Sequence, residues 1–299
     1  MLVGGESAWY CPNIYRSVMA FSTLISTAAL GLHVGDPAFA IVDCRFKLDD
    51  ESWGEREYMN LHIPGAEYAH LGRDLSGPIT GTNGRHPLPD PKTFANTLSK
   101  FGITSGVQVV AYDQDNGTYA SRLWWMLRWL GHDAAAVLDG GFKKWITEGR
   151  PTATGVETRE RKRFVGTPRV EMTADATQVG SLVRHADWRL VDARAPERFR
   201  GETEPIDRTP GHIPGAANHF YQTNLDDQGI FRSPEELRDD WREVLGTVAP
   251  SHIVCYCGSG VTACHNLLAL EHAGLKGAKL YPGSWSEWSS DPSRPVERG

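Results

Sequence analysis

Few cysteines are present, and their positions do not suit the commonest structural uses of this residue. The five cysteines stand at positions 11, 44, 255, 257 and 264. They form neither the dense, even set of a disulfide framework nor the C-x-x-C pairs of a zinc site. The spacing therefore predicts free thiols in a reducing compartment and no bound metal ion.

The chain also lacks an excess of basic residues and a long apolar segment. Its 31 Lys and Arg residues are outnumbered by 37 Asp and Glu, and no basic run is interleaved with aromatic residues, which argues against a nucleic-acid partner. The apolar run at residues 18–32 is too short to cross a bilayer. Residues 38–40 imitate a signal-peptidase site, but residues 26–33 and 38–42 also have the patterns of a capped helix and a strand. We therefore expect a cytoplasmic protein that does not bind membranes.

An internal repeat organises the rest of the chain. Five blocks recur in the same order at a period of about 145 to 150 residues, which indicates two copies of one domain. We predict an N-terminal extension at residues 1–20, a first domain at 21–148, a linker at 149–172 and a second domain at 173–299. The clearest blocks pair Ile41–Arg45 with Leu190–Arg194, His62–Ala66 with His212–Ala216, and Leu138–Trp145 with Tyr281–Trp288.

Each copy alternates short β-branched runs with helical patterns. This alternation is typical of an α/β fold in which a parallel sheet is covered by helices on both faces. Arg45 and Arg194 recur in both copies, each two residues after an aspartate, so we expect structural ion pairs with Asp43 and Asp192. In the first half the expected strands are residues 38–44, 107–113 and 135–138, and the expected helices are residues 92–101 and 120–130.

The chemistry is predicted in the loop Cys257–Thr262, which has the sequence Cys-Gly-Ser-Gly-Val-Thr. This loop follows an apolar, strand-like run at residues 252–256 and precedes a helical pattern at 263–272. Backbone N–H groups of such a loop, together with the helix N-terminus, favour negative charge, so a thiol there is expected to react as a thiolate. The residue after the matched strand in the first copy is Asp113. Only the second copy can therefore carry thiol chemistry.

These features resemble the sulfurtransferases with tandem rhodanese domains, over nearly the whole chain after residue 20. The resemblance implies a mainly parallel five-stranded sheet with helices on both faces in each domain, an inactive first domain, and a persulfide intermediate on Cys257. No cofactor is implied. The loop is similar to that of the 3-mercaptopyruvate sulfurtransferases, whereas thiosulfate-specific relatives usually carry Arg and Lys in place of Gly258 and Ser259. The loop residues implied in substrate binding are Gly258, Gly260, Val261 and Thr262.

The resemblance also implies two arginines that hold the donor's carboxylate, at Arg198 and Arg208. The first copy has an acid, Asp49, opposite Arg198, so this arginine is not a feature shared by both domains. A planar guanidinium can bind a carboxylate through two parallel hydrogen bonds. One residue more than is usual in the family separates the two arginines.

A proton donor is needed for the enolate that leaves from 3-mercaptopyruvate. The family implies a Ser-His-Asp relay for this step. Its serine matches Ser259 and its histidine matches His62. The acid lies among Asp49, Asp50 and Glu51, and we take Asp50 for this role.

The predicted reaction transfers the sulfur of 3-mercaptopyruvate to Cys257, releases pyruvate, and passes the sulfur to cyanide or to a thiol such as thioredoxin or a small thiol. A thiosulfate:cyanide sulfurtransferase is the alternative within the family. A non-catalytic persulfide carrier or redox-sensing module is the alternative from another class. A tyrosine phosphatase of the C-x5-R type is excluded because Ala263 stands where the arginine is needed. Apart from His265, nothing supports a papain-like hydrolase.

Overall fold

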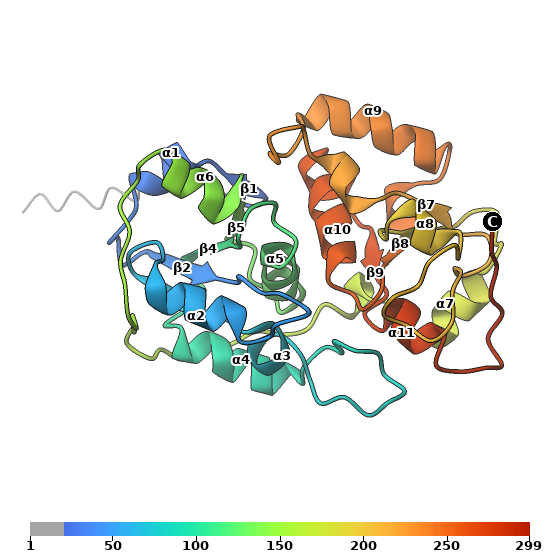
Figure 1. The fold of residues 1–299 in the computed structure, drawn as a ribbon, viewed down its shortest axis with the longest axis horizontal. Helices are drawn as coiled ribbons and strands as arrows, with labels where there is room; N and C mark the ends of the chain where they lie inside the picture. The colour runs from blue at the N-terminus through green and yellow to red at the C-terminus, as the bar shows by residue number, and fades with distance from the viewer. Residues whose placement is uncertain (1–20) are drawn as a thin grey trace, which may run out of the picture.

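The computed structural model describes residues 21–299, and the predicted extension at residues 1–20 lies outside them. The chain forms two α/β domains that lie side by side (Figure 1). Each domain has its own sheet, and the paired strands in both sheets are parallel. No helix within the described residues combines the length and apolar character that crossing a membrane requires.

The first domain is built on a five-stranded sheet in the order β1-β5-β4-β2-β3. Successive strand residues pack on opposite faces, with Ile41 and Val110 against α1 and α6, and Val42 and Val109 against α4 and α5. The elements are β1 (Leu24–Ile25), α1 (Thr27–Gly31), β2 (Phe39–Asp43), α2 (Trp53–Asn60), β3 (Ala66–Tyr68), α3 (Leu71–Asp74), α4 (Pro91–Lys100), β4 (Gln108–Tyr112), α5 (Ala120–Trp129), β5 (Ala135–Leu138) and α6 (Gly141–Thr147). The strands and helices expected in this half are confirmed to within one residue at either end.

The second domain repeats this arrangement with a four-stranded sheet in the order β7-β6-β8-β9. The expected fifth strand is reduced to a single bridge between Thr173 and Leu280. This segment extends no further because Asp175 turns to cap α7 in a capping box with Gln178. The elements are η1 (Val170–Met172), α7 (Ala176–Leu182), β6 (Arg189–Asp192), α8 (Pro196–Phe199), β7 (Ala217–Asn218), η2 (Tyr221–Asn224), α9 (Pro234–Leu245), η3 (Pro250–His252), β8 (Ile253–Tyr256), α10 (Thr262–His272), β9 (Lys279–Leu280) and α11 (Ser284–Trp288).

The repeated aspartate–arginine pairs lie at equivalent places in the two domains. Arg45 Nη2 lies 2.6 Å from Asp43 Oδ2, and Arg194 Nη2 lies 2.7 Å from Asp192 Oδ2. All four side chains are buried, and each arginine also donates to a backbone carbonyl of the same domain. The structural role predicted for Arg45 and Arg194 is confirmed.

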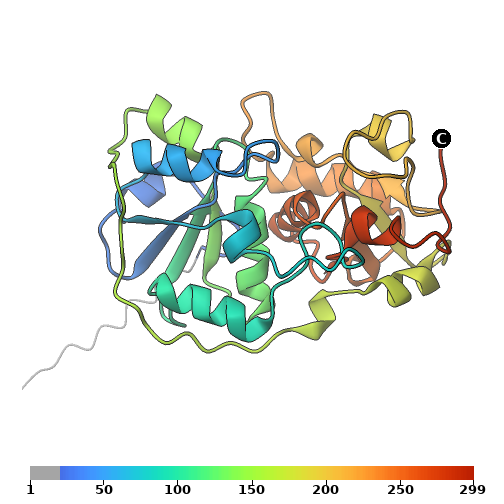
Figure 2. The same cartoon turned by 60° about the horizontal axis from the view of Figure 1, so that its bottom comes forward.

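Contacts between the domains position first-domain residues beside the second sheet. Helices α5 and α10 pack against each other, and their apolar residues belong to one buried cluster that continues through both domains. The loop between α3 and α4 extends from the first domain towards α11 (Figures 1 and 2), where the backbone N–H of Arg85 donates to Ser286 Oγ at 3.1 Å. The carboxyl end of β8 therefore faces side chains of both domains.

Candidate active site

Cys257 lies directly after β8, at the start of the loop that leads into α10. Its sulfur accepts a hydrogen bond from the backbone N–H of Gly260 at 3.2 Å, and only 2% of the residue is exposed. Position 260 requires glycine, because φ is +78° and a Cβ there would stand 2.4 Å from the carbonyl oxygen of Pro282. The tight turn at Gly260 brings a backbone donor to the sulfur.

A cavity of about 220 Å³ opens above Cys257 and is lined by both domains. Its volume suits a small molecule, and Cys257 is among the residues that line it. The second domain contributes Ala193, Arg194, Ala195, Arg198, Ile206, Phe220, Tyr221, Gly258, Ser259, Val261 and Thr262, and the first domain contributes Leu48, Arg85, Thr118 and Tyr119. The active cavity is thus a shared structure, although only one domain carries the thiol.

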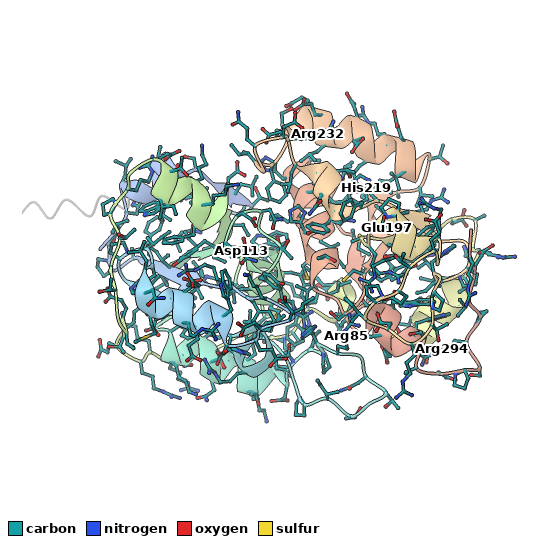
Figure 3. The ribbon with its side chains drawn as sticks, viewed as in Figure 1. Arg85, Asp113, Glu197, His219, Arg232 and Arg294 are labelled. Atoms are coloured by element: carbon teal, nitrogen blue, oxygen red, sulfur yellow. The ribbon has the colours of Figure 1, made fainter. Side chains whose placement is uncertain are left out.

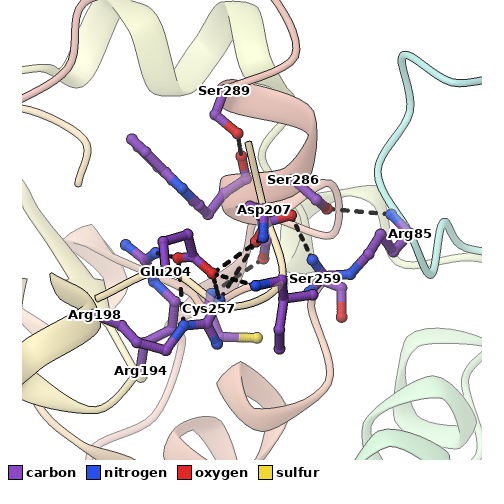
Figure 4. A network of polar contacts seen from close by, with 12 residues as sticks. Arg85, Arg194, Arg198, Glu204, Asp207, Cys257, Ser259, Ser286 and Ser289 are labelled. Carbon is purple, nitrogen blue, oxygen red and sulfur yellow. Dashed lines mark hydrogen bonds and ion pairs between the residues drawn. The ribbon is translucent and has the colours of Figure 1, made fainter. Parts of the chain in front are cut away.

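The guanidinium groups of Arg85 and Arg198 both lie near Gly258, the residue after Cys257, and both pair with Asp207 (Figure 4). A Cβ built on Gly258 would stand 2.8 Å from Arg85 Nη2 and 3.7 Å from both terminal nitrogens of Arg198. Arg198 pairs with Glu204 at 2.6 Å and with Asp207 at 3.4 Å, and Arg85 pairs with Asp207 from the opposite side. Glu204 also pairs with Arg194 at 3.1 Å, so the two carboxylates are shared among three arginines, and an anionic ligand would compete with them for Arg85 and Arg198.

The environments of the two carboxylates differ. Burial raises the pKa of Asp207, although Arg85 and Arg198 act against this rise. Burial also acts to raise the pKa of Glu204, but the hydrogen bonds from Arg198 and from the backbone of Asp207 and Ile206 outweigh it and hold this pKa below its ordinary value. Asp207 is therefore protonated more readily than Glu204.

Arg208, the second arginine predicted from the sequence, has a different position. It is exposed and lines a neighbouring depression of about 590 Å³, and Arg85 and Ile206 line both that depression and the Cys257 cavity. The structure brings Arg198 and Arg85 to the cavity. Arg85 was missed because it belongs to the first domain, where sequence reasoning sought no substrate contacts.

The predicted serine has a histidine partner, but this partner is His86. His86 Nδ1 lies 2.8 Å from Ser259 Oγ. Burial, together with the nearby cations Arg122 and Arg85, lowers the pKa of His86 to about 3, so its ring is neutral at physiological pH. In a neutral imidazole, Nδ1 either accepts a hydrogen bond from the serine hydroxyl or donates one to the serine oxygen, depending on the tautomer.

The structure does not bring His62 or Asp50 to this pair, which corrects the predicted relay. His62 Nδ1 lies 2.7 Å from the carbonyl oxygen of Tyr58, its ring stacks on Tyr58, and its backbone pairs with Ala153. Asp50 is hydrogen-bonded to the exposed Arg56, which lowers the pKa of its carboxyl. Both residues therefore have local structural partners.

The internal repeat distinguishes His62 from His86, because only His62 has a matching histidine in the second copy. His62 recurs as His212, which makes the same contact with Phe199 O at 2.8 Å in the second domain. Aligned on the helix caps Asp90 and Ser233, the second copy has Gln228 and Gly229 opposite Arg85 and His86. Residues that occur in only one copy were thus the better candidates for chemistry.

The hydroxyl of Ser284 binds the backbone N–H of Cys257, and the backbone of Ser284 itself is strained. Its Oγ accepts from the N–H of Cys257 at 3.1 Å and donates to the carbonyl oxygen of Tyr281 at 2.9 Å. It is fully buried, with φ at +55°, a region that favours glycine. The first domain has a glycine, Gly141, at the equivalent position, with φ at +56°. The strain is therefore confined to the copy that carries the thiol.

Ser284→Gly and Ser284→Ala are expected to lose the same activity but to differ in stability. Both remove the acceptor for the Cys257 N–H, which is expected to lower kcat/KM by about tenfold. Only glycine relieves the left-handed conformation, so it should be more stable than the alanine variant by about 1 kcal/mol. Thermal melts and steady-state kinetics of the two proteins measure both effects. Full activity in either variant would show that the hydroxyl is dispensable.

The first domain closes its own copy of the loop with a carboxylate. Asp113 accepts hydrogen bonds from the backbone N–H groups of Gly117 at 2.9 Å, Tyr119 at 2.7 Å and Ala120 at 3.1 Å. Figure 3 places Asp113 within the first domain and Arg85 where the two domains meet. The donors of this loop are thus occupied by a built-in anion, and no nucleophile is present.

Both domains match the model of the rhodanese-like domain, over residues 26–148 and 175–291. The chain belongs to the rhodanese family, as its resemblance to tandem rhodanese sulfurtransferases predicted. The structural features consistent with this family are the paired α/β domains and the loop that holds Cys257.

Relatives of known name extend along nearly the whole chain. The Pseudomonas aeruginosa protein named "Probable 3-mercaptopyruvate sulfurtransferase" is 44% identical over 283 residues, covering 94% of this chain and all of the relative. The bovine thiosulfate sulfurtransferase is 32% identical, covering 92% of each chain. Among solved structures, 3-mercaptopyruvate sulfurtransferase from Leishmania major has a TM-score of 0.80 at 31% identity, covering 90% of this chain and 74% of that one. The Escherichia coli 3-mercaptopyruvate enzyme has a TM-score of 0.77 at 31% identity, with 89% and 99% covered.

Proposed function

We propose that this protein is a sulfurtransferase that takes the sulfur of 3-mercaptopyruvate onto Cys257, releases pyruvate, and passes the sulfur to a thiol or to cyanide. The observation that carries the proposal is the convergence of three groups on one small cavity. Cys257 supplies the nucleophile, Arg85 and Arg198 supply two cations, and the Ser259–His86 pair supplies a hydroxyl that can move a proton. This set matches a donor with a carboxylate, a ketone and a thiol.

In the first step, the Cys257 thiolate attacks the sulfur of the bound donor. The donor's C–S bond breaks, and its electron pair forms the enolate of pyruvate. The proton of the donor thiol ends on the enolate carbon, so the products are pyruvate and the Cys257 persulfide anion. Ser259 is in reach of the cavity and donates to the ketone oxygen as negative charge grows there, with His86 fixing the orientation of its hydroxyl.

The arginines orient the donor. A carboxylate bound between Arg85 and Arg198 takes over the contacts that Asp207 makes with both side chains. Arg198 lies 3.4 Å from Asp207 but 2.6 Å from Glu204, so its contact with Asp207 is the easier of the two to displace. Binding of the donor carboxylate directs the thiol end of the molecule towards Cys257.

In the second step, an acceptor thiolate attacks the outer sulfur of the persulfide. The S–S bond breaks, Cys257 leaves as a thiolate, and the acceptor becomes a persulfide; cyanide would become thiocyanate. We propose thioredoxin or a small thiol as the acceptor. The four cysteines within residues 21–299 are free and buried, which supports a reducing compartment such as the cytoplasm.

Thiosulfate is the second candidate donor, because Arg85 places a cation above Gly258 without any charged side chain in the loop itself. The deciding experiment is to measure kcat/KM for 3-mercaptopyruvate and for thiosulfate with one acceptor. We expect a ratio that strongly favours 3-mercaptopyruvate. A ratio favouring thiosulfate would assign the enzyme to that donor. No turnover of either donor would favour the persulfide-carrier alternative.

His86→Asn is expected to lower kcat for 3-mercaptopyruvate by about a hundredfold, because Ser259 loses the partner that orients its hydroxyl for proton donation. His62→Asn should leave kcat near that of the unmodified protein. Since the pKa of His86 is lowered to about 3, protonation of His86 should cause no loss of activity down to about pH 5. Kinetics of both variants over a pH series measure these effects. A larger loss in the His62 variant would restore the relay predicted from the sequence.

A further inference from the structure

Arg122 is a buried arginine that reaches the catalytic loop from the first domain. It lies on α5 and is completely inaccessible to solvent. Its Nη1 donates to the carbonyl oxygen of Gly260 at 3.0 Å, and its Nη2 donates to the carbonyl oxygen of His86 at 3.1 Å. One side chain therefore holds both the turn beneath Cys257 and the segment that carries the histidine partner of Ser259.

No carboxylate within residues 21–299 forms an ion pair with Arg122, and its Nε has no hydrogen-bond partner there. A buried charge without a partner is costly, and burial lowers the pKa of this guanidinium. The groups that favour its charged form are the sulfur atoms of Cys264 and Cys257. Burial raises the pKa of Cys264 to about 12 in spite of Arg122, so Cys264 stays a neutral thiol. Cys257 is the sulfur that becomes anionic during the proposed reaction.

The internal repeat provides a comparison within the same molecule. His265 stands five residues after Gly260, as Arg122 stands five residues after Gly117, and both glycines have positive φ. His265 Nε2 lies 3.0 Å from the carbonyl oxygen of Asn116, in the loop of the first domain. Each central helix thus sends one side chain to the loop of the other domain. The loop with Asp113 receives an imidazole whose pKa is lowered by burial to about 3 and which is therefore neutral.

From this asymmetry we propose that Arg122 is a positioning residue whose fixed positive charge stabilises the anionic sulfur of Cys257, both as the attacking thiolate and as the persulfide. The cation absent from the loop sequence is supplied from beneath it by the domain that has no nucleophile. The persulfide part of this proposal rests on the proposed function. The thiolate part concerns the resting protein and can be tested without a donor.

Other charged and titratable groups surround the loop and must stay constant in the test. The cavity side carries three arginines, Arg85, Arg194 and Arg198, with their carboxylates. These groups, with the buried thiols and phenols nearby, are Arg85, Arg194, Arg198, Glu204, Asp207, His86, Tyr119, Tyr221, Cys255 and Cys264. Variants at position 122 substitute none of these residues, although they also change the contact of Arg122 with the carbonyl oxygen of His86.

The experiment compares Arg122→Gln with Arg122→Lys. Glutamine keeps a donor for the Gly260 carbonyl but has no charge, whereas lysine keeps the charge without the planar fork. Arg128→Gln is the matched control, because Arg128 also lies on α5 and reaches α10 through Glu271 at 3.4 Å, without touching the loop. Folding of each protein is checked by thermal melting.

The readout is the rate at which iodoacetamide alkylates Cys257 in the absence of donor, followed across pH by mass spectrometry of the Cys257 peptide. We expect the midpoint of this profile to rise by about one pH unit in Arg122→Gln. Arg122→Lys should stay close to the unmodified protein, and Arg128→Gln should not change. With 3-mercaptopyruvate, kcat should fall about tenfold in the glutamine variant only.

Two results would overturn the proposal. One is a folded Arg122→Gln protein with an unchanged midpoint. The other is an Arg122→Lys protein whose midpoint rises, since the charge would then not be the cause; this result decides the matter even if the glutamine variant does not fold. If the unmodified protein turns over neither donor while the midpoint responds to Arg122→Gln, the proposed function fails and the role of Arg122 stands.

Discussion

Cys257→Ser is expected to abolish sulfur transfer from both 3-mercaptopyruvate and thiosulfate. A serine hydroxyl is a far weaker nucleophile towards sulfur than a thiolate and forms no persulfide, so we expect turnover to fall by at least about a thousandfold. The change replaces one atom at a site that is 2% exposed, and the Gly260 N–H can donate to the new oxygen. The fold should therefore be retained.

Mass spectrometry of the intact protein measures the same prediction directly. After incubation with 3-mercaptopyruvate and no acceptor, the unmodified protein should gain the mass of one sulfur atom, and Cys257→Ser should gain none. Cys44→Ala, in the core of the first domain, is the matched control and should still gain the sulfur. Sulfur carried by Cys257→Ser on Cys264 would contradict the assignment of the nucleophile.

Arg198→Ala and Arg85→Ala are each expected to raise KM for 3-mercaptopyruvate by about ten- to a hundredfold, the size expected for a lost hydrogen bond to a charged group. The effect on KM should exceed the effect on kcat, because the carboxylate is bound before and during the reaction. Steady-state kinetics with each donor provide the measurement. Arg161→Ala, an exposed change in the linker, is the control.

Arg208→Ala tests whether the donor's carboxylate is bound by Arg208, as the sequence predicted, or by Arg85, as the structure indicates. Arg208 is exposed and lies beyond the Arg85–Asp207 pair, so its removal should change KM only slightly if the cavity in this structure is the donor site. A rise in KM as large as that of Arg198→Ala would mean that Arg208 moves to the donor when it binds. Arg85→Ala would then be expected to have the smaller effect.

Much of the fold could be predicted from the sequence because the same domain is repeated within the chain. Matched blocks located the strands, and the recurrence of Arg45 as Arg194 identified both as structural partners of aspartates. The position of Cys257 after β8 followed from the strand–loop–helix pattern. Local sequence patterns determine these features, so a single sequence contains enough information to predict them.

The rest of the site depends on contacts between domains, which a linear pattern does not record. Arg85, His86 and Arg122 come from a loop and a helix of the first domain and meet Cys257 only through tertiary packing. The sequence prediction named His62, whereas the structure places His86 beside Ser259, because the contact between these two residues crosses from one domain to the other. The strain at Ser284 likewise required backbone geometry to be recognised.

The order of these residues along the chain has a consequence for biosynthesis. The first domain is made first and can fold with its loop closed by Asp113, which satisfies the loop donors without help from the second domain. Cys257 emerges later and lacks its backbone partner until Ser284 follows. The backbone contact at Cys257 can therefore form only after Ser284 has been synthesised, and a chain that stops before Ser284 carries this thiol without it.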